Sequence, residues 1–113
     1  MNYQIVTTKD FDKAIKKLSK KFFSLKADLI AFQEELLKNP TIGDDLGDNT
    51  RKVRMAITSK NKGKSGGARV ITYHFFIDVV NTDIYLLTIY DKGEQEDISE
   101  KEIKNLKEKN GLV

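Results

Sequence analysis

The stretch that decides the fold is KVRMAITSKNKGKSGGARVITYHFF, Lys52–Phe76. Its first part alternates, with Val53, Met55 and Ile57 on one face of a predicted strand and Lys52, Arg54, Ala56 and Thr58 on the other. From Arg69 onward it is rich in β-branched and aromatic residues, which favour a second strand. The glycines between the two supply the positive φ angles that a tight reversal needs. The stretch therefore predicts a β-hairpin.

The sequence Gly63-Lys64-Ser65 inside this hairpin also occurs in phosphate-binding P-loops. A P-loop needs a further glycine five residues before its Gly-Lys, and it leads directly into a helix. Here Thr58 occupies the glycine position, and the residues after Gly67 predict a strand. A nucleotide-hydrolase loop is therefore not expected, and the glycines are assigned to the turn.

Further strands are expected on both sides of the hairpin. Asn81–Asp83 provides a turn, and Ile84–Lys92 predicts a third strand that completes a meander. A β-rich run at Tyr3–Thr7 predicts a short N-terminal strand. Alternation in the last strand places four residues on one face: Leu86, Thr88, Tyr90 and Lys92. We expect a small, twisted, antiparallel sheet made of the N-terminal strand and the three-stranded meander.

Two helices are predicted between the first strand and the meander. Apolar residues recur at helical spacing across residues 11–22, and lysines cover the remaining surface, which is typical of a basic amphipathic helix. A second helix is expected over residues 26–39, and Pro40 forbids its continuation. The turn-forming residues in 40–51 predict a connecting loop.

The C-terminal segment predicts a third helix. Ser99 is suited to be its N-cap, Glu102 completes a capping box three residues later, and Gly111 is a suitable end. The expected fold is a single α+β domain over residues 1–113. The two N-terminal helices pack on one face of the sheet, and the C-terminal helix docks separately.

The composition restricts the chemistry that the chain can perform. With 113 residues, no cysteine and one histidine, disulfides, thiol catalysis and zinc sites built from several imidazoles are excluded. Asp78, Asp83 and Asp91 are not spaced for a magnesium site, so neither a metal nor another cofactor is expected. The N-terminus has no apolar signal-peptide core and no run is long enough to span a membrane, which predicts a cytoplasmic location without membrane association.

The positive charge is concentrated in the middle of the chain. Residues 49–77 contain seven Lys or Arg and no Asp or Glu, so this segment has a charge of +7, whereas the whole chain has a net charge of +3. Residues 1–48 are neutral and residues 78–113 carry −4. Mutual repulsion within such a segment favours an anionic partner. The alternative is a solvated face that salt screens and that carboxylates such as Glu94 and Glu96 fold back to neutralise.

The predicted alternation brings cations and phenols from three strands onto one helix-free face of the meander. These residues are Lys52, Arg54, Arg69, Tyr73, Tyr90 and Lys92. Neighbouring strands lie about 5 Å apart, so long side chains on three strands can surround one phosphate. Arginine grips phosphate oxygens and tyrosine can stack on a base, which favours RNA. The loop residues Lys60, Lys62 and Lys64 are expected to contact the RNA backbone.

The sequence resembles the RelE/HigB-like toxins of bacterial type II toxin–antitoxin systems, within the RelE/ParE superfamily. The resemblance is carried, in order, by FDKAIKKL, NPTIGDDLGDNTRKVRMAI, GKSGGARVITY and IYLLTIYDKGEQEDIS. It implies a small twisted sheet flanked by helices, and a metal-independent endoribonuclease that cuts messenger RNA, typically on the ribosome. It also implies a cognate antitoxin, which we expect to be acidic and partly disordered.

The resemblance also implies roles for particular residues. Lys52 and Arg54 match the family's basic pair on the strand after the loop, Arg69 matches the arginine that opens the next strand, and Lys92 matches the basic residue that ends the last one. The prototype's functional tyrosine falls at Ile98 here, so that role is unfilled. We hypothesise that Lys52 is the base, since neighbouring cations favour its uncharged amine. Arg54 and Arg69 would clamp the transition state, and Lys92 or Tyr90 would be the acid.

Two further interpretations complete the sequence picture. The alternative to a nuclease is a non-catalytic superfamily member. It would be either a gyrase inhibitor or a degenerate toxin that binds RNA or regulates its operon. The fold alone does not distinguish a nuclease from these proteins. His74 has the pKa range of an RNA-cleaving acid or base. Alternation places it on the face opposite Arg69, so we expect a structural role for it.

Overall fold

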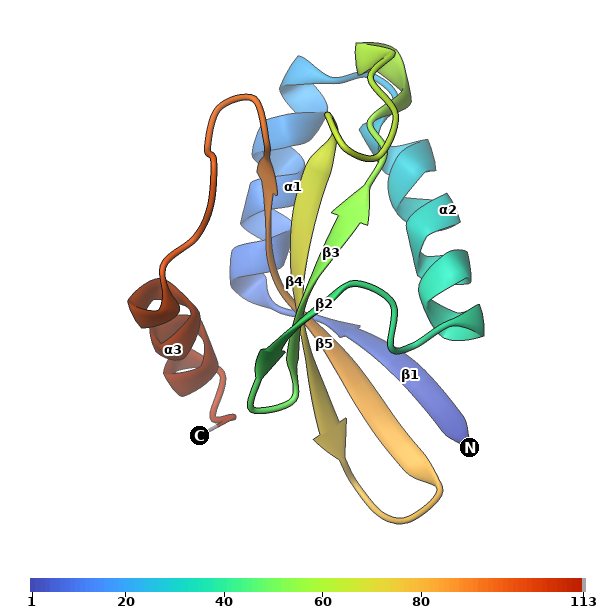
Figure 1. Ribbon diagram of the computed structural model, residues 1–113, viewed down its shortest axis with the longest axis vertical. Coiled ribbons are helices and arrows are strands. Elements are labelled where there is room, and N and C mark those ends of the chain that lie inside the picture. The colour runs from blue at the N-terminus through green and yellow to red at the C-terminus, as the bar shows by residue number, and fades with distance from the viewer. Residues whose placement is uncertain (113) are drawn as a thin grey trace.

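A five-stranded mixed sheet forms the centre of the molecule in the computed structural model, which describes residues 1–112 (Figure 1). The strands are β1 (Asn2–Thr7), β2 (Asp44–Gly47), β3 (Thr50–Met55), β4 (Ala68–Phe76) and β5 (Asn81–Asp91), in the spatial order β1-β5-β4-β3-β2. β1 is parallel to β5, and the other neighbours are antiparallel. The α+β class is confirmed, whereas the expectation of four antiparallel strands is wrong on both number and direction.

The unpredicted strand, β2, comes from the segment that was expected to be a loop. Asp48 and Asn49 connect β2 to β3 with φ angles of 50° and 59°. Positive φ at both central residues is the mark of the type I′ turn, whose twist matches that of a hairpin. Both residue types tolerate this conformation better than most, so the turn had a recognisable sequence signal.

The helices lie where the sequence predicted them. α1 (Lys9–Lys21) begins after Thr8, whose hydroxyl accepts a hydrogen bond from the N–H of Phe11 and donates one to Leu86 O at 2.9 Å. α2 (Leu25–Lys38) ends before Pro40. α3 (Glu100–Lys109) is capped by Ser99, as expected. The short 3₁₀ helix η1 (Thr58–Lys60) follows β3.

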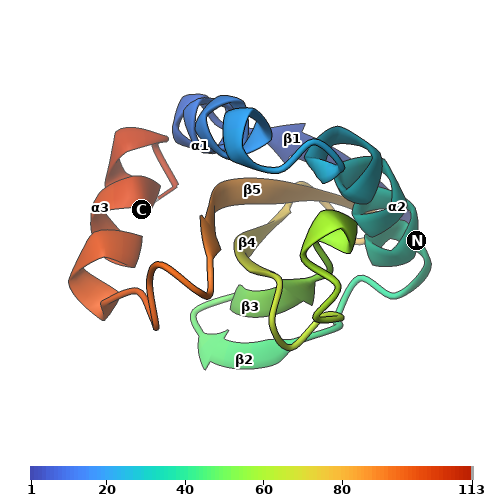
Figure 2. The same cartoon turned by 90° about the horizontal axis from the view of Figure 1, so that it is seen from above.

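The sheet separates two apolar clusters. α1 and α2 cover one face and build the larger cluster with β3, β4 and β5, while α3 packs on the other face through Ile103 (Figure 2). The second cluster contains Ile71, Leu87 and Tyr90. The face that was expected to be free of helices is therefore partly covered by α3, because Ile103 and its neighbours need an apolar partner.

A β-bulge in β5 changes which side chains share a face. The β4–β5 register shifts between Ile71, which pairs with Thr88, and Thr72, which pairs with Leu86. Leu86 therefore faces α1 and α2, and the additional residue Leu87 joins the cluster under α3. The expectation that Leu86 shares a face with Thr88 and Tyr90 is wrong, since a bulge resets the alternation.

The glycines of the loop before β4 have a structural role at Gly67. A Cβ atom at this position would lie 2.3 Å from Met55 O, so only glycine allows β4 to start this close to the end of β3. The same residue accepts a hydrogen bond from Lys92 N at 3.0 Å, which ties the end of β5 to the loop.

Candidate functional site

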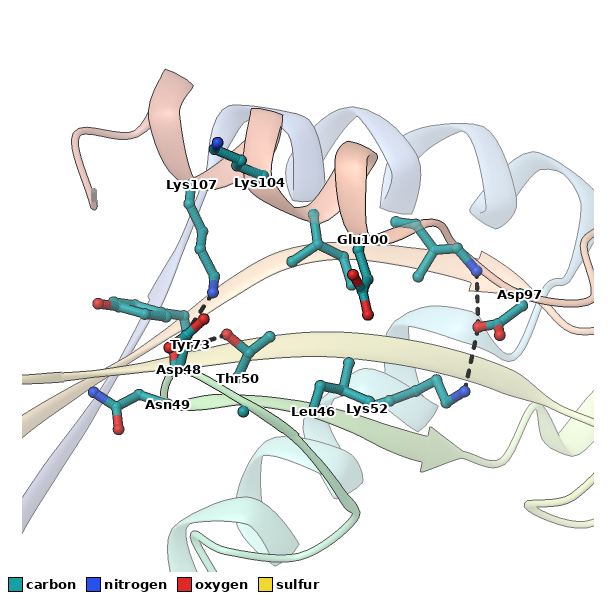
Figure 3. A pocket seen from close by; sticks show the side chains of 13 residues that line it. Leu46, Asp48, Asn49, Thr50, Lys52, Tyr73, Asp97, Glu100, Lys104 and Lys107 are labelled. Atoms are coloured by element: carbon teal, nitrogen blue, oxygen red, sulfur yellow. Dashed lines mark hydrogen bonds and ion pairs between the residues drawn. The ribbon is translucent and has the colours of Figure 1, made fainter.

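A cavity of about 800 Å³ lies between α3 and the β2–β3 hairpin (Figure 3). We call it the α3 pocket. Its lining includes these charged or aromatic side chains: Lys52, Tyr73, Asp97, Glu100, Lys104 and Lys107. Pockets of about 300–1,000 Å³ hold ligands of the size of a nucleotide. Two of the residues predicted from sequence, Lys52 and Tyr73, therefore line a ligand-sized cavity.

Lys107 reaches into the α3 pocket from α3. Its side chain is buried, its Nζ lies 5.1 Å from the centre of the Tyr73 ring, and it is 3.5 Å from Asp48 O. Burial lowers the pKa of Lys107, and the nearby Asp48 carboxylate opposes that shift only in part. A lysine whose pKa is shifted by burial in a pocket is a candidate functional residue. Sequence reasoning did not select this residue.

Lys52 occupies the other end of the pocket. Its Nζ lies 3.2 Å from an oxygen of Asp97, and Figure 3 shows it directed away from Lys107. The Asp97 carboxylate accepts hydrogen bonds from the backbone N–H of Ile98 and from the Lys52 ammonium, and both bonds lower the pKa of Asp97. Because Asp97 is exposed, an anionic ligand could replace it at Lys52 at small cost. A lysine that already holds an exposed carboxylate is suited to hold a phosphate in its place.

The predicted convergence across three strands is present next to the pocket. Arg54 pairs in register with Arg69, and Arg69 pairs with Tyr90, so one row crosses β3, β4 and β5. Lys52 lies on the same face one step along β3. Arg54 is exposed and makes no ion pair within residues 1–112. It is the member of the row that remains available to a ligand.

The guanidinium group of Arg69 is used inside the fold. Arg69 is buried, and it donates hydrogen bonds to Lys64 O at 3.2 Å, Ala68 O at 3.2 Å and Ser65 O at 3.0 Å. These bonds hold the loop that precedes β4 against the sheet. Arg69 thus satisfies carbonyl groups that a mobile loop would leave to water.

Tyr90 lies deep in the second apolar cluster. Its hydroxyl is buried without a hydrogen-bond partner in the described part of the chain. Burial, and then the negative charge of Asp97, raises the pKa of Tyr90 to about 12. Tyr90 does not line the α3 pocket, so a ligand there would not reach it without a shift of the segment before α3.

The lysines predicted to contact RNA from the hairpin loop differ in their surroundings. Lys60 Nζ lies 2.6 Å from the buried Asp91 carboxylate, and only 13% of its side chain is exposed. Lys64 pairs with Glu35 at 2.7 Å on the surface. Lys62 is exposed. Lys62 is therefore available to bind RNA, and Lys64 becomes available when its surface pair with Glu35 breaks. Lys60 instead stabilises the fold.

The end of β5 shows the same local neutralisation. Lys92 pairs with Glu96 at 3.2 Å, and Lys21 of α1 pairs with Glu94. Neither lysine belongs to residues 49–77, so the expectation that Glu94 and Glu96 neutralise that segment is wrong. Asp97 and Asp91 instead pair with two of its cations, Lys52 and Lys60. Lys92 lies outside the α3 pocket, although it is close to the loop that Arg69 holds.

His74 is buried on the face that α1 and α2 cover, and its ring packs edge-on to Phe76 with centroids 6.4 Å apart. Burial, and then the charge of Arg51, lowers the pKa of His74. The expectation that it lies opposite Arg69 is confirmed. Within residues 1–112 no group of three His, Cys, Asp or Glu side chains is arranged to hold a metal ion.

Lys107 and Lys104, which sequence reasoning missed, had a signal in the α3 pattern. Lys107 follows Ile103 by four residues, which places both on the same side of a helix, and Ile103 is the residue that docks. A lysine on the docking side of a helix is enclosed at an interface instead of pointing into solvent. The predicted site was confined to the meander and so did not include α3.

No protein-family model matches this chain. In the part of the chain that the structure describes, no helix has the length and apolar character needed to cross a bilayer. The features of the described residues that point to a function are the α3 pocket and the cationic row beside it.

Proposed function

We propose that this chain is a RelE/HigB-like toxin of a type II toxin–antitoxin system and that it cleaves messenger RNA, on the ribosome, without a metal ion. The observation that carries the proposal is the α3 pocket, which has a lysine at each end, Lys52 and Lys107, and the Tyr73 ring beside Lys107. Lysines bind phosphates, and an aromatic ring offers a surface to a base. The volume of the pocket, about 800 Å³, is in the range of sites that hold ligands of nucleotide size.

The proposed reaction is an attack of a ribose 2′-oxygen on the adjacent phosphorus. The 2′-O–P bond forms, the P–O5′ bond breaks, and the products are a 2′,3′-cyclic phosphate and a free 5′-hydroxyl. The base must take the 2′-hydroxyl proton, and cations must stabilise the additional negative charge on the phosphate. The departing 5′-oxygen takes a proton from water, and the protonated base returns its own proton to the solvent. No redox partner and no metal are needed to balance this step.

We assign the base to Lys107 in this scheme, because its Nζ is enclosed in the pocket 5.1 Å from the centre of the Tyr73 ring and burial lowers its pKa. Lys52 would hold the phosphate after Asp97 is displaced, and exposed Arg54 would bind the next phosphate along the strand. Lys104 adds positive charge at the rim of the pocket. Lys62 and Lys64 would contact more distant phosphates, and an acidic antitoxin would cover these cations.

A second candidate is a protein that binds RNA without cutting it. Three features favour it: Arg69 is bonded to loop carbonyls, Tyr90 is enclosed, and the family's tyrosine position holds Ile98. These features leave no evident acid to protonate the departing 5′-oxygen. Binding would then rest on the same cations, with no loss of function when Lys107 loses its proton-accepting group but keeps a positive charge.

The two candidates are separated by incubating the purified protein with ribosomes and messenger RNA and mapping new 5′ ends. The nuclease proposal predicts new ends for the wild type and for Lys101→Met, an exposed change on α3 outside the pocket. It predicts a strong loss for Lys107→Met and also for Lys107→Arg, which keeps the charge but does not release a proton. Retained RNA binding without any new 5′ ends would overturn the nuclease proposal and leave the binding protein.

A further inference from the structure

Helix α1 carries a straight line of lysines, which we call the α1 row: Lys9, Lys13, Lys16 and Lys20. They follow each other at steps of four, three and four residues, and all four are exposed. Since a helix turns by about 100° per residue, their side chains fall within roughly 60° of each other, on the side opposite the buried Phe11 and Leu18. The α1 row is therefore the outermost line of the helix.

The rest of the chain does not neutralise the α1 row. None of its lysines takes part in an ion pair within residues 1–112. Their neighbours in the helix do, since Asp10 pairs with Lys109 and Lys21 pairs with Glu94. The exposed carboxylate of Asp12 lies beside the row. Four positive charges thus stand against one negative charge.

The arrangement of the α1 row has a cost for the helix. Side chains three or four residues apart lie about 5–6 Å from each other, so like charges at these steps repel. Lys9 is also the first residue of the helix, where the macrodipole disfavours a cation. Both costs disappear when closely spaced negative charges lie along the row. The row therefore favours a polyanion as its partner.

The surroundings of the α1 row favour phosphates over an acidic protein. None of the large apolar side chains of α1 is exposed, whereas a protein interface needs an apolar core. The exposed Phe23 lies in the turn beyond the helix, so α1 itself exposes no ring on which an unstacked base could lie. A lysine surface without aromatic side chains suits the backbone of a paired nucleic acid, whose bases stay stacked inside the helix.

The positive surface continues from α1 to the loop before β4. Lys20 precedes Lys21, and the ammonium groups of Lys21 and Lys60 both contact Asp91. Figure 1 shows the end of α1 and η1 at the same end of the molecule, and the loop after η1 carries the exposed Lys62. α1 and α3 lie on opposite faces of the sheet (Figure 2), so a ligand on the row leaves the α3 pocket open.

We propose that the α1 row binds the phosphate backbone of an RNA helix, in addition to the messenger strand in the α3 pocket. The choice of RNA rests on the proposed function, because lysines on phosphates do not read the bases. From Lys9 to Lys20 the row is about 16 Å long, so it follows a few neighbouring phosphates of one strand. Such binding is independent of sequence and weakens steeply as salt is added.

Two variants of equal charge test the proposal in a binding titration with a short, fluorescent RNA duplex of mixed sequence. One variant removes most of the row through three changes: Lys13→Gln, Lys16→Gln and Lys20→Gln. The control removes three exposed lysines that also lack an ion pair within residues 1–112: Lys26→Gln, Lys38→Gln and Lys101→Gln. Each variant lowers the net charge from +3 to 0. Glutamine has nearly the helix propensity of lysine, so both should keep the wild-type circular dichroism.

The row variant should bind the duplex about thirtyfold more weakly than the wild type, and its slope of log affinity against log salt should be smaller by about three. The control should lose at most about threefold in affinity, with little change in slope. Equal losses in the two variants, or no duplex binding by the wild type, would overturn the proposal and leave the row to solvent or to an acidic protein. Tighter binding of a DNA duplex of the same length would overturn the choice of RNA.

The titration is independent of messenger RNA cleavage. Lys107→Met, which changes the α3 pocket, should bind the duplex as the wild type does, because the pocket lies on the other face of the sheet. A chain that produces no new 5′ ends but binds the duplex through the α1 row would overturn the nuclease proposal and support this one. Cleavage with equal duplex affinity in the row variant and the wild type would do the reverse.

Discussion

Two lysine–aspartate pairs show how this fold distributes its positive charge. Lys60 and Asp91 lie 2.6 Å apart with side chains 13% and 3% exposed, whereas Lys52 and Asp97 lie 3.2 Å apart with side chains 23% and 63% exposed. The residue types are the same, but the first pair is enclosed between η1 and the end of β5. The second lies at the mouth of the α3 pocket. The burial of the acid decides whether a lysine holds the fold together or is free to exchange its partner for a ligand.

The difference follows from the cost of removing charge from water. A buried carboxylate without a partner is strongly unfavourable, so Lys60 cannot leave Asp91 to bind RNA without destabilising the protein. An exposed carboxylate is solvated when its partner leaves, so the exchange at Lys52 costs little. Of the seven cations in residues 49–77, the fold thus commits Lys60 and Arg69 to structure and leaves Lys52, Arg54 and Lys62 accessible.

The largest effect that would sharpen this contrast is expected from Lys60→Met. The change leaves the buried Asp91 carboxylate with the N–H of Gly93 and with Lys21, at 3.7 Å, and should lower the free energy of unfolding by about 3 kcal/mol. Urea denaturation measures it. The matched control is Lys64→Met, which breaks the surface pair with Glu35 and should change stability by about 0.5 kcal/mol or less. Equal losses in the two variants would contradict the distinction.

The next effect is expected at the pocket. Lys107→Met should reduce the rate of messenger RNA cleavage about thirtyfold, equivalent to about 2 kcal/mol, because the proposed base is lost. Its stability should be unchanged or higher, since a buried ammonium is replaced by an apolar chain of similar length. Single-turnover cleavage and urea denaturation of the same sample separate the two readouts. A large loss of stability would instead give Lys107 a structural role like that of Lys60.

A smaller effect is expected from pH. Burial alone raises the pKa of Asp91, but the hydrogen bonds from Lys60 and from the N–H of Gly93 outweigh it, so the net pKa is lowered. A lowered folded-state pKa stabilises the fold above the ordinary aspartate range, and this contribution disappears as the pH falls through the folded-state pKa. Thermal unfolding between pH 7 and acid pH should therefore show less acid sensitivity in Lys60→Met than in Lys64→Met. If the melting temperature falls equally with pH in both variants, the Lys60–Asp91 pair does not cause the acid sensitivity.

The smallest effect is expected from Asp97→Asn. Removing this exposed carboxylate frees Lys52 for phosphate without exposing a buried charge, so RNA affinity should rise about twofold to threefold at low salt. The gain should shrink as salt is added. Fluorescence anisotropy with a short RNA measures it, and Glu108→Gln, an exposed change on α3 outside the pocket, is the control. Unchanged affinity would mean that Lys52 does not contact RNA.

Most secondary structure could be read from local patterns because its causes are local. Capping by Thr8 and Ser99, the stop before Pro40 and the alternation in β3 depend on residues within a few positions of each other. β2 was missed although the Asp48–Asn49 turn left a signal. The bulge at Leu87 left none that local alternation could reveal, because it is defined by pairing with β4.

The sequence by itself determined the α+β class, the three helices and the presence of Lys52, Arg54, Arg69 and Tyr90 on one face of the sheet. Only the tertiary structure decided that β1 runs parallel to β5, that α3 brings Lys107 over Tyr73, and that Asp91 binds Lys60. Side-chain direction along one strand follows from the period of the backbone. The availability of a charge depends on burial and on partners that are distant in sequence, and only packing brings these together.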